Sequence, residues 1–233
     1  LLKSMAACVA FGFDGAAARS TPRALVTGNP VRAEIEALPA PAARFAGRAG
    51  RLRMVVFGGS LGARALNSVL PQALALWPAH ERPFFTHQTG SALHAETLAA
   101  YAQAGIELVD GVAEVIPFTS DVAGLLANAD VVICRAGAIT VAELCAAGVP
   151  SLLVPLVVST TAHQRDNALL MQAEGAALNV PQDELTPASL HARLNGLDRP
   201  LLLAMAERAR ALARPHAAAR VADEIEQLTE RRA

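Results

Sequence analysis

Strand-like and helix-like segments alternate without interruption between residues 52 and 181. Short apolar runs rich in Val, Ile, Leu and Phe are each followed by a segment whose apolar residues recur at helical spacing. This alternation predicts an α/β fold, a doubly wound parallel sheet with helices on both faces and right-handed crossovers, whose ligands bind at the carboxyl ends of the strands. We expect strands at residues 52–59, 83–90, 106–118, 129–135, 151–156 and 175–181, and helices at 63–76, 91–104, 122–127, 140–147 and 164–174.

Composition excludes several classes of protein. Hydrophobic residues make up 53% of the chain and aromatic residues only 4%, which is unlike a stacking platform for single-stranded nucleic acid. Lys and Arg number 20 against 21 Asp and Glu, so no basic field would attract nucleic acid, and we expect no such partner. Cys8, Cys134 and Cys145 have neither metal-ligand nor disulfide spacing, which suits a reducing cytosol. The longest apolar run, residues 152–158, is too short to span a bilayer and contains Pro155.

The two flanks of the alternating region have a different character. Residues 1–31 carry a single strand-like piece, ALVTGNPV, and are too few to form a domain alone. The Pro-, Ala- and Gly-rich stretch at residues 34–51 suits a connection between domains more than a core element, so we place a boundary near Pro30. Residues 220–232 predict a charged amphipathic helix that needs a surface to cover. Because the chain begins with Leu and without a clean cleavage region, we expect it to start within a longer protein.

The stretch at residues 131–147 predicts a site for an anion. A buried strand at residues 131–134 leads into a turn of small residues at 136–138, and a helix follows. The unpaired amides at the start of that helix would point toward a ligand above the strand ends, where a phosphate is favoured. Glu143 lies one turn further on, where its carboxylate could accept hydrogen bonds from the hydroxyls of a ribose.

A second glycine-bearing turn, GGSLGA at residues 58–63, also lies between a strand and a helix. Its glycines allow close backbone approach to a phosphate or sugar, and Ser60 offers a hydroxyl near the helix amides. Tight packing alone could equally explain these glycines, and the motif matches neither G-x-G-x-x-G nor a Walker loop. Both turns follow strands of one sheet, so they can converge on one crevice.

A third polar cluster, AHQRDN at residues 162–167, begins a helix at the same edge of the sheet. Gln164 and Asn167 lie on adjacent turns of one helix face, which suits hydrogen bonds to sugar hydroxyls. The alternative is helix capping by the Ser-Thr-Thr run at 159–161 with a solvated first turn and a surface His163. No Ser/His/Asp arrangement, metal-ligand cluster or defined carboxylate pair appears, so the sequence does not indicate a hydrolase.

Five blocks in this order resemble the MurG family of bacterial glycosyltransferases: GNPVR at 28–32, GGSLGA at 58–63, HQTG at 87–90, CRAGAITVAEL at 134–144 and HQRDNA at 163–168. The resemblance implies inverting transfer of N-acetylglucosamine from UDP-N-acetylglucosamine to lipid-linked N-acetylmuramoyl-pentapeptide, the step from lipid I to lipid II in peptidoglycan synthesis. It also implies two Rossmann-like domains of the GT-B type, of which the second binds the donor.

On this resemblance, residues 1–30 are a remnant of the N-terminal acceptor domain with a linker, and residues 31–214 are the UDP-sugar-binding domain. Residues 215–233 are a C-terminal helix expected to pack on the N-terminal domain. That domain is expected to be largely missing, and with it the general base, so the fragment alone should be inactive. The whole enzyme would make peripheral contact with the cytoplasmic face of the inner membrane through the same domain.

The resemblance also assigns substrate-binding residues. Ser60 and its loop face the diphosphate and sugar of the donor, Arg32 lies nearby at the domain junction, and the backbone of Thr119 holds uracil. The helix amides of Ala138, Ile139 and Thr140 bind the diphosphate. Glu143 binds the ribose hydroxyls, and Gln164 with Asn167 matches the loop that reads the sugar. No metal and no cofactor beyond the donor substrate is implied.

This sequence departs from the family pattern at three places: Leu61 replaces a Gln, Phe-Thr-Ser-Asp at 118–121 replaces Phe-Ile-Asp-Asp, and His163 replaces a Gln. Two alternative functions remain open. One is an enzyme like a UDP-N-acetylglucosamine 2-epimerase, which shares the donor and the two-domain architecture. The other is a non-catalytic module that binds a nucleotide sugar.

Overall fold

A six-stranded sheet forms the centre of the computed structural model, which describes residues 6–59, 63–156 and 163–230. All of its neighbouring strands pair in parallel, in the order β5-β4-β3-β6-β7-β8. The parallel α/β architecture predicted from the sequence is therefore confirmed. The strands are β3 (Arg53–Phe57), β4 (Phe84–Gln88), β5 (Ala113–Ile116), β6 (Val131–Cys134), β7 (Ser151–Leu153) and β8 (Ala177–Asn179).

The strand order reverses at β3. From β3 the chain builds β4 and β5 on one side, and then returns to place β6, β7 and β8 on the other. The register pairs Phe57 with Cys134, so the loops that leave β3 and β6 begin side by side. In open α/β sheets this switch point opens a crevice at the carboxyl ends of the strands.

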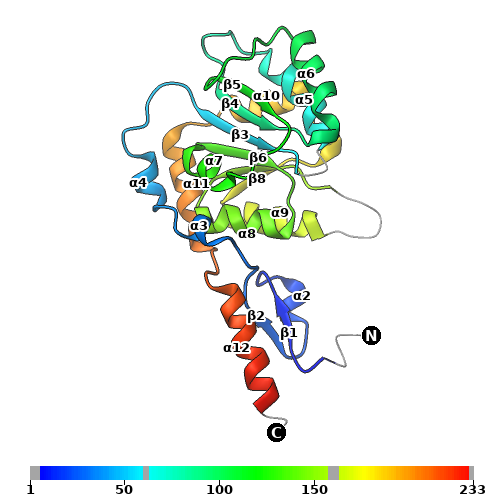
Figure 1. Ribbon diagram of the computed structural model, residues 1–233, viewed down its shortest axis with the longest axis vertical. Helices are drawn as coiled ribbons and strands as arrows, with labels where there is room; N and C mark the ends of the chain where they lie inside the picture. The colour runs from blue at the N-terminus through cyan, green and yellow to red at the C-terminus, as the bar shows by residue number, and fades with distance from the viewer. Residues whose placement is uncertain (1–5, 60–62, 157–162, 231–233) are drawn as a thin grey trace.

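Helices cover both faces of the sheet (Figure 1). One face packs against α5 (Arg64–Leu74), α6 (His94–Gln103), α10 (Pro187–Asn195) and most of α11 (Arg199–Ala211). The other packs against α7 (Val122–Asn128), α8 (Ala138–Ala147) and α9 (His163–Ala173). Short 3-10 turns, η1 (Ser91–Leu93) and η2 (Gln182–Glu184), complete the connections. No described helix is long and apolar enough to cross a membrane.

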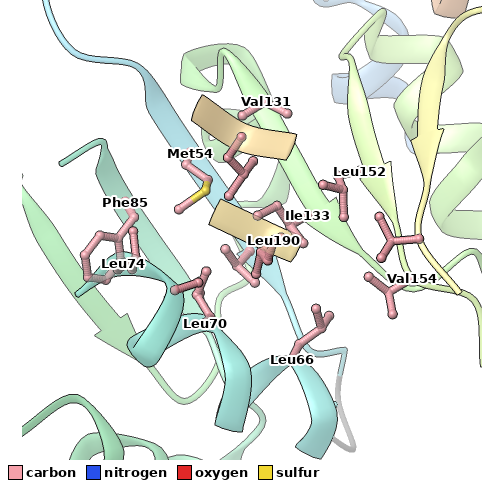
Figure 2. Close-up of a cluster of buried hydrophobic side chains, with 14 of the residues drawn as sticks. Met54, Leu66, Leu70, Leu74, Phe85, Val131, Ile133, Leu152, Val154 and Leu190 are labelled. Carbon is pink, nitrogen blue, oxygen red and sulfur yellow. The ribbon is translucent and has the colours of Figure 1, made fainter. Parts of the chain in front are cut away.

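Strand β6 shows why helices must pack on both faces of the sheet. Val131 and Ile133 point into the core on the α5 and α10 side, where Figure 2 shows them with Met54 and Leu190. Val132 and Cys134 point into the opposite core. Because successive side chains of a strand alternate between faces, a strand that is apolar at every position must be buried on both sides.

The stretch at residues 34–51 is part of the core, so its prediction as mainly a connection was wrong. It forms α3 (Ala33–Glu36) and α4 (Pro41–Phe45), and Ile35 and Phe45 are buried. Arg44 donates to the carbonyl oxygens of Leu126 at 3.1 Å and Ala147 at 2.7 Å, near the ends of α7 and α8. The Arg44 guanidinium is a cation, and cations are favoured near the carboxyl ends of helices. These contacts hold the stretch in place, and its composition does not reveal them.

The first residues also contain more structure than the single strand expected. β1 (Val9–Phe11) pairs in parallel with β2 (Ala24–Val26), and α2 (Ala16–Arg19) connects them. These elements lie with α12 (Ala217–Glu230) beyond the main sheet, at the lower end of Figure 1. Gly28 has φ +87°, and a Cβ there would lie 2.5 Å from the Cβ of Arg214, so the two chain segments cross in close contact.

Candidate functional site

A pocket of about 180 Å³ opens at the carboxyl edge of the sheet, beside the switch point between β3 and β6. The ends of β3 and β4, the loop after β5, α7 and the first half of α8 form its walls. Its lining residues are Phe57, Gly59, Gln88, Phe118, Thr119, Val122, Leu126, Thr140, Glu143 and Leu144.

The lining divides into an apolar part and a polar part. Phe57, Val122 and Leu126 offer apolar surface, and Phe118 stands 63% exposed on the wall. Thr140 and Glu143 bring a hydroxyl and a carboxylate from α8. An apolar slot with a few convergent polar groups is typical of a small-molecule site, and here it suits a flat ring linked to a hydroxyl-bearing group.

Glu143 is held by Arg32. The side chain of Glu143 is 14% exposed, and its Oε1 accepts hydrogen bonds from Arg32 Nε at 3.2 Å and Nη2 at 2.8 Å. Both bonds end on one oxygen, and no described residue donates to Oε2. Asn29 Nδ2 donates to the carbonyl oxygen of Ala138 at 3.4 Å, so the segment at residues 28–32 contacts α8 twice.

Within the part of the chain that the structure describes, no acceptor pairs with the backbone amides in the first turn of α8. The helix begins at Ala138 after Gly137, whose backbone is extended and which has no side chain to cap the amides. Ala138 is exposed, as is Ile139 at 51%, and no acidic residue lies in this turn. The partial positive charge of this helix end therefore remains available to an anion beside the pocket.

The glycine turn after β3 reaches the same pocket. Gly58 N donates to the carbonyl oxygen of Gln88 at 2.8 Å, and Gly59 lines the cavity with φ +74°, a backbone conformation that favours glycine. Ser60 and Leu61 lie outside the described residues.

Gln164 and Asn167 hold neighbouring loops. Gln164 Oε1 accepts from the backbone N–H of Leu156 at 2.9 Å, and Asn167 Nδ2 donates to the carbonyl oxygen of Ala136 at 3.0 Å. Neither lines the pocket, and His163 is exposed at the start of α9. The structure thus gathers Arg32, Thr119 and the predicted residues of α8 around one site. The side-chain amides of Gln164 and Asn167 lie outside that pocket, and Asn167 contacts the turn between β6 and α8.

Sequence reasoning missed Gln88 and the apolar wall of α7. The available signal for Gln88 was the HQTG block, which follows a strand at the edge where the other motifs converge. For Val122 and Leu126 no motif marks a role, because apolar residues on a helix are expected in a core.

His87, next to Gln88, belongs to a buried network. Its Nδ1 lies 2.9 Å from Tyr101 Oη and its Nε2 lies 3.1 Å from Asn67 Oδ1. Burial, with the nearby His94 as a lesser cause, lowers the pKa of His87 to about 3, so the ring is neutral near pH 7. Asn67 Nδ2 in turn donates to the carbonyl oxygen of Thr89 at 3.0 Å, which supports the chain just after β4.

The described residues contain no group of three or more His, Cys, Asp or Glu side chains placed to hold a metal ion.

Comparison with known proteins gives both a family and close relatives. The model of the glycosyltransferase family 28 C-terminal domain matches residues 53–228. A relative from Methylibium petroleiphilum, named UDP-N-acetylglucosamine--N-acetylmuramyl-(pentapeptide) pyrophosphoryl-undecaprenol N-acetylglucosamine transferase, is 65% identical over 97% of this chain and 61% of its own length. A relative of the same name from Chromobacterium violaceum is 62% identical over 93% of this chain and 59% of its own length.

Solved structures agree with these relatives. The crystal structure of Acinetobacter baumannii MurG is similar with a TM-score of 0.81 and 34% identity, over 97% of this chain and 62% of that one. The calicheamicin glycosyltransferase CalG4, at 21% identity and a TM-score of 0.60 over 92% of this chain and 50% of that one, shows likeness of fold alone. The chain spans about three fifths of the length of the relatives it matches.

Proposed function

This chain belongs to the glycosyltransferase family 28 C-terminal domain family, and on that premise we propose that it binds UDP-N-acetylglucosamine as the donor-binding part of an inverting N-acetylglucosaminyltransferase. Its parallel sheet matches the carboxy-terminal Rossmann-like domain of the GT-B architecture. We further propose that residues 31–214 form this domain, with residues 1–30 and 215–233 belonging to the junction with an N-terminal acceptor domain.

The observation that carries the proposal is the junction of an apolar slot, a carboxylate and a helix N-terminus at one edge of the sheet. Uracil occupies the slot, where the backbone of Thr119 can read its polar edge and Val122 contacts its ring. The ribose hydroxyls donate to Glu143, which is a hydrogen-bond acceptor while ionised. The diphosphate then meets the amides of Ala138, Ile139 and Thr140.

The sugar lies beyond the diphosphate, toward Gly59 and the start of α9. Gln164 and Asn167 contribute there by holding the backbone at Leu156 and Ala136, and each amide retains further hydrogen-bonding capacity for a sugar hydroxyl.

The reaction is attack by an acceptor hydroxyl on the anomeric carbon while UDP departs. Negative charge grows on the diphosphate as the glycosidic bond breaks. The fixed dipoles of the first turn of α8 stabilise that charge, which is electrostatic catalysis by preorganised donors. This role requires the turn to stay free of acidic side chains, as it does.

The names of the relatives supply the acceptor class: an N-acetylmuramyl-pentapeptide linked through pyrophosphate to undecaprenol. A lipid-linked acceptor requires the enzyme to work at a membrane surface. We therefore propose that the whole enzyme acts in peptidoglycan synthesis, in peripheral contact with the cytoplasmic face of the inner membrane.

Calorimetric titration of the 233-residue chain with UDP and UDP-N-acetylglucosamine tests donor binding. Binding of both ligands, weakened at least tenfold in Glu143→Ala, supports the assignment, since a buried hydrogen bond to a charged group contributes about 1.5–3 kcal/mol. Glu207→Ala, an exposed substitution on α11, is the matched control. Unchanged affinity in Glu143→Ala would remove the ribose role, and failure of the unmodified chain to bind either ligand would overturn the function.

Product analysis of the whole enzyme distinguishes transfer from 2-epimerisation.

A further inference from the structure

Gln88 occupies a position between the two walls of the pocket. It is the last residue of β4, the strand between β3 and β5, and the register pairs it with Phe57 on one side and Ile116 on the other. It is only 4% exposed. The chain leaves β3 through Gly59 and leaves β5 through Pro117, and both departing segments line or adjoin the pocket.

The side chain of Gln88 joins these two segments. Its Nε2 donates to the carbonyl oxygen of Gly59 at 3.2 Å and to that of Pro117 at 3.2 Å. The main chain adds to the first contact, because the carbonyl oxygen of Gln88 accepts from Gly58 N at 2.8 Å. Phe118 and Thr119, which face the cavity, directly follow the Pro117 carbonyl.

A primary amide is chemically suited to this position. It carries two N–H groups on one nitrogen, so one neutral side chain can donate to two carbonyl oxygens at once. A Glu of the same length has no N–H and, when ionised, would set a third oxygen against the two carbonyls. A Met of similar length would fill the space with no donor, and both carbonyl oxygens would lose the hydrogen bond that Gln88 donates.

We propose that Gln88 is a positioning residue that holds the two walls of the nucleoside pocket at the separation required for the base. This proposal rests on the function proposed above, since it concerns the same pocket. Both hydrogen bonds of the bridge join protein atoms only, so the bridge orders the two loops without a contribution from the nucleoside, and binding is spared that cost.

The test is calorimetric titration of Gln88→Met and Gln88→Glu with uridine and with UDP. Gln172→Met and Gln172→Glu are the matched controls, because Gln172 is exposed on α9. We expect affinity to fall on the order of tenfold in Gln88→Met, the size of one or two net hydrogen bonds, and further in Gln88→Glu. Because the defect lies in the nucleoside pocket, uridine and UDP should lose affinity by the same factor.

Hydrogen-deuterium exchange gives a second measurement. It can be made on Gln88→Met alone, so the test does not depend on whether Gln88→Glu folds. Exchange should quicken at residues 58–59 and 117–121 while the rest of the sheet stays protected. A Gln88→Met chain with lowered thermal stability but unchanged affinity for uridine and UDP would overturn the proposal, because the amide would then serve folding alone. Failure of the unmodified chain to bind UDP would instead overturn the proposed function, and this inference with it.

Discussion

Arg32 donates two hydrogen bonds to a single oxygen of Glu143, a residue 111 positions later in the chain. The contact joins the segment before α3 to the second turn of α8, and it fixes the orientation of a carboxylate that faces the pocket. The remaining oxygen can then meet a ligand hydroxyl without reorganisation. The pair is partly exposed, at 41% for the Arg32 side chain, so its contribution to stability is expected to be small and its contribution to orientation larger.

Arg32→Gln should therefore weaken UDP binding about three- to tenfold while changing the free energy of unfolding by roughly 0.5 kcal/mol or less. Titration calorimetry and urea unfolding measure the two effects. Arg193→Gln, which breaks an exposed ion pair with Glu184, should change neither by a comparable amount. Equal UDP affinity in Arg32→Gln would show that Glu143 does not need this partner.

Ile139→Glu should change stability and binding in opposite directions. A carboxylate in the first turn of α8 stabilises the helix by about 0.3–1 kcal/mol, but it occupies the positive end that the diphosphate would use. We expect a slightly higher melting temperature, UDP affinity lower by about tenfold or more, and unchanged affinity for uridine. Ile225→Glu, on the exposed face of α12, is the control for added charge. If UDP affinity persists in Ile139→Glu, the diphosphate lies elsewhere.

His87 should make the protein less stable in mild acid. Burial lowers its pKa to about 3 from an ordinary value of 6.5, so between these values the unfolded chain takes up a proton that the folded chain does not. The contribution of the neutral His87 ring to the free energy of unfolding is therefore complete above pH 6.5 and is lost as the pH falls toward 3. At pH 5 the loss is about 2 kcal/mol. Urea unfolding of the protein and of His87→Gln at pH 7 and pH 5 isolates this effect, because other titrating groups are shared. Parallel pH profiles would contradict it.

Asp130→Asn should destabilise the fold and leave the site intact. Asp130 is fully buried at the amino end of β6, with Oδ1 2.6 Å from Arg48 Nη1 and Oδ2 2.9 Å from Arg199 Nη2. Removing its charge leaves two largely buried guanidinium groups without their carboxylate, at a cost of about 3 kcal/mol. Urea unfolding should show this loss, while UDP affinity of the folded protein should match that of the exposed control Asp183→Asn. A large loss of affinity would link this edge of the sheet to the pocket.

Local sequence patterns predicted the elements that matter most for the site. The apolar run of β6, the small-residue turn after it and the stop at Gly148 were sufficient to predict α8 and its free amino-terminal end. Gly148 ends the helix with φ +62°, which a side chain would strain. These features are readable because each depends on residues within a few positions of one another.

The sequence did not predict contacts between residues that lie far apart along the chain. The residues of the stretch at 34–51 looked like a linker because the carbonyls that Arg44 binds come from helices 82 and 103 positions away. Gln164 and Asn167 looked free for a ligand, and their bonds to Leu156 and Ala136 became visible only in the structure.

By itself, then, the sequence determined the parallel α/β sheet, the edge at which the pocket opens and the helix end suited to an anion, because strand and helix periodicity and glycine conformation act locally. Only the tertiary structure decided that Arg32 orients Glu143 and that Gln88 bridges Gly59 and Pro117. Those contacts depend on the order and register in which distant strands pair, and that arrangement is set by the packing of the whole sheet rather than by any short run of residues.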